Sequence, residues 1–100
     1  MAVTSQFLAK VKTALRVSYT DTAIDNQITD LIDAAILDLT ETADIKPFTS
    51  ADADALQTDA VISYVQYRWF DDSKYLTIYN DMKSKLALSG KYRSVMPDEE

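Results

Sequence analysis

The chain of 100 residues suggests a single domain, and its lack of cysteine and histidine excludes disulfides, thiol nucleophiles, imidazole bases and zinc fingers. Apolar residues make up 47% of the sequence and charged residues 26%, which is ordinary for a globular protein and excludes a disordered one. A net charge of −6 argues against a general nucleic-acid binder, which needs a cationic surface against phosphate. With one glycine and two prolines available for turns, we expect long helices joined by brief connections.

The charge is unevenly spread along the chain. Residues 1–20 carry three cations and no acid, residues 21–59 carry ten acids against one lysine, and residues 60–100 hold six charges of each sign. The three parts therefore sum to +3, −9 and zero, which gives the net charge of −6. The first part is expected to be either a solvated basic surface or a contact with an acidic neighbour, through Lys10, Lys12 and Arg16.

A first helix of about a dozen residues is expected to begin at Thr4 or Ser5, because either side chain can cap its free N–H groups. Its apolar face consists of Phe7, Leu8, Val11, Ala14 and Leu15. The residues before it lack the basic region and apolar run of a secretory signal, so the chain is expected to fold in a reducing cytoplasm.

A second helix is the clearest amphipathic segment, and its candidate caps are Thr20, Asp21 and Thr22. Apolar residues recur along it at helical spacing, at Ile24, Ile28, Leu31, Ile32, Ala35, Ile36 and Leu39. The opposite face is polar but contains one leucine, and it is formed by Asn26, Asp30, Asp33, Leu37 and Glu41. That leucine is either an ordinary surface residue or part of an interface.

The longest connection runs from Thr42 to Ser50 and contains a proline. Phe48 within it is expected to pin the loop to the core, with a subunit contact as the alternative. Ser50 is predicted to cap a third helix, with Asp52 and Asp54 in its first turn. Because capping and the helix dipole already explain carboxylates at a helix start, no metal site is expected there.

The third predicted helix includes residues 60–70 and is apolar nearly all round. Helical spacing gives it two apolar sides, one with Leu56, Ala60, Tyr64 and Tyr67 and the other with Val61, Val65 and Trp69. Such a helix must be covered on several sides, so it is the central helix or partly a subunit interface. It is too short and too interrupted to span a membrane.

A polar turn at residues 71–73 leads into a fourth helix, for which Ser73 is the predicted cap. Gly90 is placed to end this helix, whose apolar stripe consists of Tyr75, Tyr79, Met82 and Leu86. Residues 91–100 have no helical period, so a flexible tail is expected there. The predicted fold is therefore all-α: a small bundle of about four helices with short connections over residues 1–90, and an extended C-terminal tail.

The sequence contains no catalytic constellation, so neither an enzyme nor a cofactor is expected. No serine lies in a Gly-x-Ser-x-Gly elbow or a Ser-x-x-Lys arrangement, and one glycine cannot form a glycine-rich phosphate loop. The aromatic residues between Tyr64 and Tyr79 could stack on bases, but their helical spacing and the scarcity of interleaved cations favour a core role.

Several pieces of the sequence follow one another in a familiar order. A lysine-bearing helix ends in Leu-Arg-Val (residues 8–17), an acidic joint follows (residues 20–25), and the next helix contains Leu-Ile-Asp-Ala-Ala (residues 28–35). An aromatic third helix (residues 60–70) then leads into the polar turn Asp71-Asp-Ser-Lys-Tyr75. Over roughly residues 4–90, this order and spacing resemble the small head-tail connector, or adaptor, proteins of tailed bacteriophages.

The resemblance implies a structural virion protein of the neck, assembled in the host cytoplasm. The family's subunits form a ring, usually twelvefold, beneath the portal protein after DNA packaging, and are expected as monomers before docking. The ring extends the DNA channel and offers a docking surface to the next connector (stopper) or tail protein. DNA passes through without specific binding, and no membrane is involved.

The resemblance and the residue patterns together predict three surfaces. A ring needs side-to-side contacts, which are expected at Leu37, Phe48, Val61, Val65 and Trp69. A DNA channel should repel DNA, and the predicted wall consists of Asp30, Asp33 and Glu41. A tail segment that contacts the portal or the neighbouring subunit is expected at Tyr92, Val95 and Met96.

A different class of function is also compatible with the sequence. The chain could be a small acidic helical regulatory module that binds a single protein partner. An antitoxin, or an inhibitor that mimics DNA with its acidic segment, would have this composition.

Overall fold

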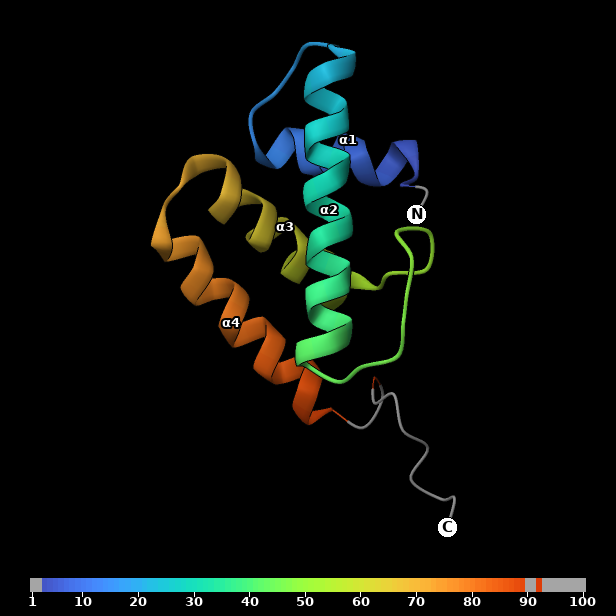
Figure 1. The fold of residues 1–100 in the computed structure, drawn as a ribbon, viewed down its shortest axis with the longest axis vertical. Helices are drawn as coiled ribbons and strands as arrows, with labels where there is room; N and C mark the ends of the chain where they lie inside the picture. Colours follow the sequence, from blue (N-terminus) through green and yellow to red (C-terminus); the bar gives the residue numbers. More distant parts are fainter. Residues whose placement is uncertain (1–2, 90–91, 93–100) are drawn as a thin grey trace.

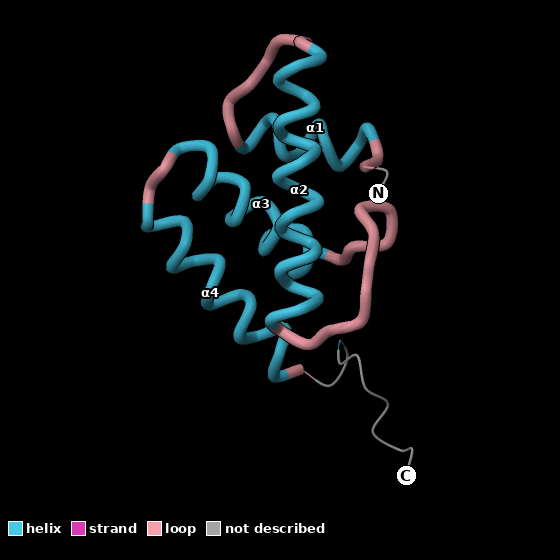
Figure 2. Tube along the Cα trace, viewed as in Figure 1, coloured by secondary structure: helices cyan, strands magenta, loops and turns pink. Residues whose placement is uncertain are grey.

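The computed structural model describes residues 3–89 and Tyr92. Within them the chain has four helices and no β-strand, so the predicted all-α fold is confirmed (Figures 1 and 2). The predicted helix stop at Gly90 and the predicted tail contacts of Val95 and Met96 lie outside the described residues. The helices are α1 (Ser5–Ala14), α2 (Thr22–Thr42), α3 (Ala55–Phe70) and α4 (Ser73–Leu88).

The helices are arranged around α3. α2 runs along one broad face of the molecule, α1 crosses behind it, and α4 lies beside α3 (Figure 1). α3 packs against α1, α2 and α4. The Cα trace is 18 Å thick along its shortest axis, so the molecule is a slab with α2 on one broad face and α1 on the other.

The core is centred on α3, in which Ala60, Val61 and Val65 are 0% exposed. These side chains share one cluster with buried residues of the other helices, among them Phe7, Val11, Ile28, Ile32, Leu39, Tyr79 and Leu86. Full burial of one aliphatic side chain contributes about 1.5–3 kcal/mol. The nearly all-round apolar helix therefore obtains its cover within a single chain.

The first two helices begin at predicted caps. The Thr4 hydroxyl accepts the N–H of Phe7 at 3.1 Å and so caps α1. Asp21, one of the three candidates, caps α2 by accepting the N–H groups of Ala23 and Ile24. Each cap provides a partner for backbone donors that the first helical turn leaves free.

The predicted caps of the last two helices are wrong. α3 is capped by Asp54 rather than Ser50, in a capping box: its carboxylate accepts the N–H of Gln57, whose side chain accepts the N–H of Asp54. α4 is capped by Asp72 rather than Ser73. In both cases a carboxylate also complements the positive end of the helix dipole, which a serine hydroxyl does not do.

The connection between α2 and α3 is fixed to the rest of the chain. Ile45 and Phe48 are buried, so Phe48 pins the loop to the core as predicted. The Ser50 hydroxyl accepts the backbone N–H of Thr4 at 2.9 Å, which ties the loop to the start of α1. The loop therefore belongs to the packed body of the molecule.

A side-chain link joins α2 to α4. Asp38 of α2 accepts the hydroxyl of Tyr79 at 2.5 Å and pairs with Lys83 at 3.4 Å. Burial, together with the hydrogen bond to Asp38, raises the pKa of Tyr79 above its usual value. The Tyr79 ring also contacts Tyr64 of α3 edge-on, with ring centroids 5.2 Å apart.

Three helices are followed by a residue in the left-handed region, although none of these residues is glycine. They are Arg16 (φ 62°), Asp44 (φ 54°) and Asp71 (φ 55°). At the end of α1 the N–H of Arg16 donates to the Thr13 carbonyl and that of Val17 to the Lys12 carbonyl, which is a Schellman motif. A side chain with a Cβ atom is strained at such a position.

Substitution of Arg16 by glycine is therefore expected to stabilise the free protein by about 0.5–1 kcal/mol, because glycine adopts this backbone conformation without strain. Urea denaturation followed by circular dichroism measures the change. Arg16→Ala is the matched control, since it removes the same charge but keeps Cβ. An equal gain from both variants would contradict the explanation by backbone strain.

Removal of the Tyr79 hydroxyl tests the link between α2 and α4. Tyr79→Phe is expected to cost about 1–2 kcal/mol of unfolding free energy, because it deletes a hydrogen bond to a charged group. Tyr75→Phe serves as the control, because the Tyr75 hydroxyl makes no hydrogen bond within the described residues. Equal stability of the two variants in urea would show that the link contributes nothing.

Candidate interaction surfaces

Three of the five residues predicted at a subunit interface lie inside the core of one chain. Phe48, Val61 and Val65 are 6%, 0% and 0% exposed, so they have no surface left for a neighbouring subunit. The prediction is wrong for these three because α1, α2 and α4 cover α3 on both of its apolar sides. Trp69 remains partly exposed, and Leu37 is 57% exposed.

Trp69 lines a shallow hollow on the surface between α2 and α3, while part of its ring packs against the core. The other residues around this hollow are Gln27, Asp30, Leu31 and Arg68. Arg68 donates to the Tyr64 hydroxyl at 2.9 Å. The exposed part of the indole therefore lies beside the acidic side of α2.

The outward side of α2 forms an acidic ridge, which we define as Asp30, Asp33, Leu37 and Glu41. Leu37 follows Asp33 by four residues and precedes Glu41 by four, so helical spacing places them on one side. All are exposed except Asp33, which is half-buried. The sequence predicted a channel wall for the carboxylates and a subunit contact for the leucine. One ridge cannot face both DNA and a neighbouring subunit, so the two roles exclude each other.

The opposite broad face carries α1 and its cations. Lys12 is engaged within the chain, because its ammonium group lies 2.8 Å from the Asp25 carboxylate of α2. Lys10 and Arg16 are exposed, and neither has a carboxylate within ion-pair distance in the described part of the chain. We call this surface, with Lys10 and Arg16, the α1 face.

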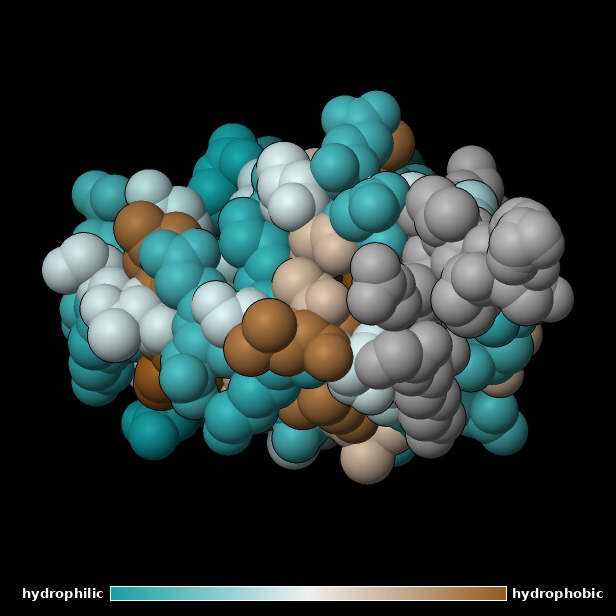
Figure 3. All heavy atoms as spheres, turned by 90° about the horizontal axis from the view of Figure 1, so that it is seen from below, coloured by the Kyte–Doolittle hydropathy of each residue, from teal (hydrophilic) through white to brown (hydrophobic). Residues whose placement is uncertain are grey.

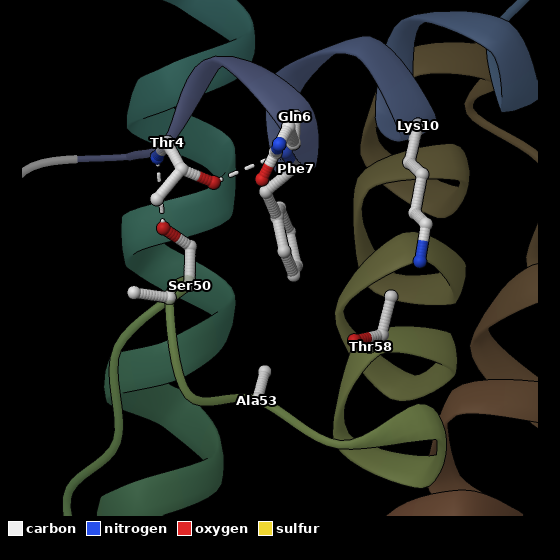
Figure 4. A pocket seen from close by; sticks show the side chains of 8 residues that line it. Thr4, Gln6, Phe7, Lys10, Ser50, Ala53 and Thr58 are labelled. Atoms are coloured by element: carbon white, nitrogen blue, oxygen red, sulfur yellow. Dashed lines mark hydrogen bonds between the residues drawn. The ribbon is translucent and has the colours of Figure 1, made fainter.

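Two hollows lie on the α1 face. Lys10 extends from α1 over the first hollow toward Thr58 of α3 (Figure 4). The other residues lining this hollow are Thr4, Gln6, Phe7, Ser50, Ala51 and Ala53. Arg16 lines the second hollow together with Ala14, Gln66, Phe70, Asp72 and Tyr75. Phe70 is 40% exposed, so this face offers apolar surface beside its cations.

The end of the molecule at which α4 finishes carries Leu88, which is 85% exposed. The view from below shows hydrophobic side chains gathered within a mostly hydrophilic surface (Figure 3). A single exposed leucine is normal for a soluble protein, so Leu88 by itself does not mark an interface.

Tyr92, predicted to contact the portal, binds its own chain. Its carbonyl accepts the N–H of Lys46 at 2.8 Å, and its hydroxyl donates to the Asp54 carboxylate at 2.5 Å. The ring packs against the core cluster. Tyr92 therefore fastens the chain after α4 to the connection between α2 and α3. Nothing in the sequence signals this contact, because its partners lie about forty residues away.

The carboxylates near the start of α3 have structural roles. The Asp52 carboxylate accepts both the N–H and the hydroxyl of Thr49, and these hydrogen bonds lower the pKa of Asp52. Asp54 caps the helix. Residues 3–89 and Tyr92 contain no group of three or more potential metal ligands. Among the same residues, no helix has the length and apolar character required to cross a membrane.

Asp33 is the least well solvated carboxylate of the acidic ridge. Desolvation raises the pKa of Asp33, and the negative charge of Asp30 acts in the same direction. One carboxylate oxygen of Asp33 is buried and has no hydrogen-bond partner among the described residues. Ionisation of this group therefore weakens the fold.

Comparison with protein families gives a match over most of the chain. The family model described as phage connector protein matches residues 7–93, which include all of α2, α3 and α4 and most of α1. No curated protein matches the chain, and no solved structure does.

The raised pKa of Asp33 predicts a stability change that depends on pH. Because the folded state favours the protonated carboxyl, the penalty is absent below the unfolded-state pKa, near 3.8, and complete above the folded-state pKa. Asp33→Asn, which cannot ionise, should raise the melting temperature at pH 7 and give no gain near pH 3. A gain of equal size at both pH values would contradict an electrostatic cause.

Proposed function

The chain belongs to the phage connector protein family, and from this premise we propose that it assembles as a ring beneath the portal of a tailed bacteriophage. The ring would extend the DNA channel after packaging and present a docking surface to the next connector or tail protein. The observation that carries this proposal is the family match over residues 7–93. Twelve copies are proposed, as is usual in the family.

The fold supports assembly from folded monomers. The core closes within one chain, so each subunit can fold before it meets the portal. One broad face carries exposed carboxylates on α2 and the other carries the exposed cations Lys10 and Arg16 on α1. A ring of identical subunits needs two different faces that complement each other. Both features are compatible with sequential addition to a portal.

The family's role is structural rather than enzymatic. The hollows on the two broad faces are shallow and open to solvent. The virion neck is accordingly the proposed location of the protein.

The predicted channel wall of Asp30, Asp33 and Glu41 stays a prediction, as does the tail contact of Tyr92. The regulatory alternative, an antitoxin-like protein or DNA mimic, would use the same acidic ridge to occupy a DNA-binding partner. The family match favours the connector over this alternative.

Mixing the protein with purified portal rings tests the proposal. Native mass spectrometry should show a fixed whole number of copies bound to each portal, and electron microscopy should show added density beneath it. The protein without portal is the control and should remain monomeric. A chain that never joins portal rings, or one that competes with DNA for a DNA-binding protein, would contradict the connector role.

A further inference from the structure

The acidic ridge combines an exposed apolar side chain with flanking carboxylates. Leu37 is 57% exposed, although every other large aliphatic residue of α2 is buried or half-buried. Carboxylates flank it one turn away on each side, at Asp33 and Glu41. An apolar side chain ringed by charges is the common arrangement of a small interface centre with a polar rim.

The α1 face offers the complementary chemistry. Lys10 and Arg16 have no ion-pair partner in the described residues, and both stand at the rims of hollows. Phe70 and Tyr75 contribute apolar surface to the second hollow, which Asp72 also lines. A leucine with carboxylates on both sides fits such a surface, because its side chain can enter a hollow while the carboxylates meet the cations.

The two surfaces lie on opposite broad faces of a thin molecule. α2 lies in front of α1 in Figure 1, whereas α1 lies in front of α2 in Figure 4, which looks at the molecule from the other side. Contacts between opposite faces of identical subunits are heterologous, and they repeat from subunit to subunit until a ring closes.

We infer that the acidic ridge of one subunit docks on the α1 face of the next, with Leu37 at the centre of the contact. This inference rests on the proposed ring and assigns its side-to-side interface. It replaces the channel role predicted for Asp30, Asp33 and Glu41. A ridge turned toward the channel would leave Leu37 in water and the cations of the α1 face without partners.

The energetics agree with a monomer that assembles only on the portal. Exposed ion pairs contribute little each, and salt screens them. Charge complementarity therefore selects the correct face and register more than it provides affinity. Subunits already bound to a portal are held at high effective concentration, so a weak contact suffices to close the ring.

Charge exchange between the two faces tests the inference on portal rings. The ridge variant carries Asp30→Lys and Glu41→Lys, and the α1-face variant carries Lys10→Glu and Arg16→Glu. A combined variant carries all four changes. Each two-residue variant is expected to assemble on the portal roughly 100-fold more weakly, because like charges then meet across the contact. The combined variant should recover assembly, because the charges oppose each other again.

A matched control exchanges charges elsewhere. Asp81→Lys with Lys85→Glu reverses an exposed ion pair of α4 within one helix, so assembly should not change. The unmodified protein provides a second measurement that does not depend on folding of any variant. Its assembly should weaken as salt is raised from about 0.05 M to 0.5 M, because the Debye length falls from about 14 Å to 4 Å.

The outcomes separate the two levels of the proposal. If the unmodified protein does not form rings on the portal, the connector function itself fails. If it does, and the combined variant is no better than the two-residue variants, the assigned interface is wrong. Normal rings from the ridge variant would likewise overturn the inference. DNA retained in those rings would support the channel wall instead.

Discussion

The other three helices are positioned by the need to bury α3. A helix with apolar residues on nearly every side is stable in water only if neighbours cover it, and here α1, α2 and α4 do so within one chain. This arrangement uses the apolar faces of all four helices in one core. Among the surfaces left for partners are the outer sides of α2 and α1, which carry exposed charged residues.

How far the sequence predicts the fold varies from helix to helix, for physical reasons. The stripe of α2 has a strong period, so its buried and exposed sides were both predicted correctly, with Leu37 among the exposed residues. α3 has almost no polar side, so periodicity does not separate the residues that pack within the chain from those that face a neighbouring subunit. For this reason the sequence wrongly places Val61 and Val65 at a subunit interface. The cap at Asp54 carries a local signal, because a capping box needs a capping residue followed three residues later by Glu or Gln, and Gln57 follows Asp54 at this distance.

The contacts that periodicity could not predict join distant residues. Tyr79 binds Asp38 from the middle of α4, and Tyr92 binds Asp54 from beyond its end. Each of these contacts depends on how the helices finally pack, so no local sequence pattern predicts it. The interface between faces is of the same kind. The basic first part and the acidic middle part of the chain are visible in the sequence. Only the fold shows that α1 and α2, which carry them, lie on opposite sides of a slab.

A core that closes within one chain makes the folded monomer the unit of assembly. The most direct measurement is the melting temperature of the isolated protein over a hundredfold range of concentration, because stabilisation by self-association depends on concentration. We expect a single cooperative transition whose midpoint does not change with concentration. A melting temperature that rises with concentration would show that α3 needs cover from a second chain.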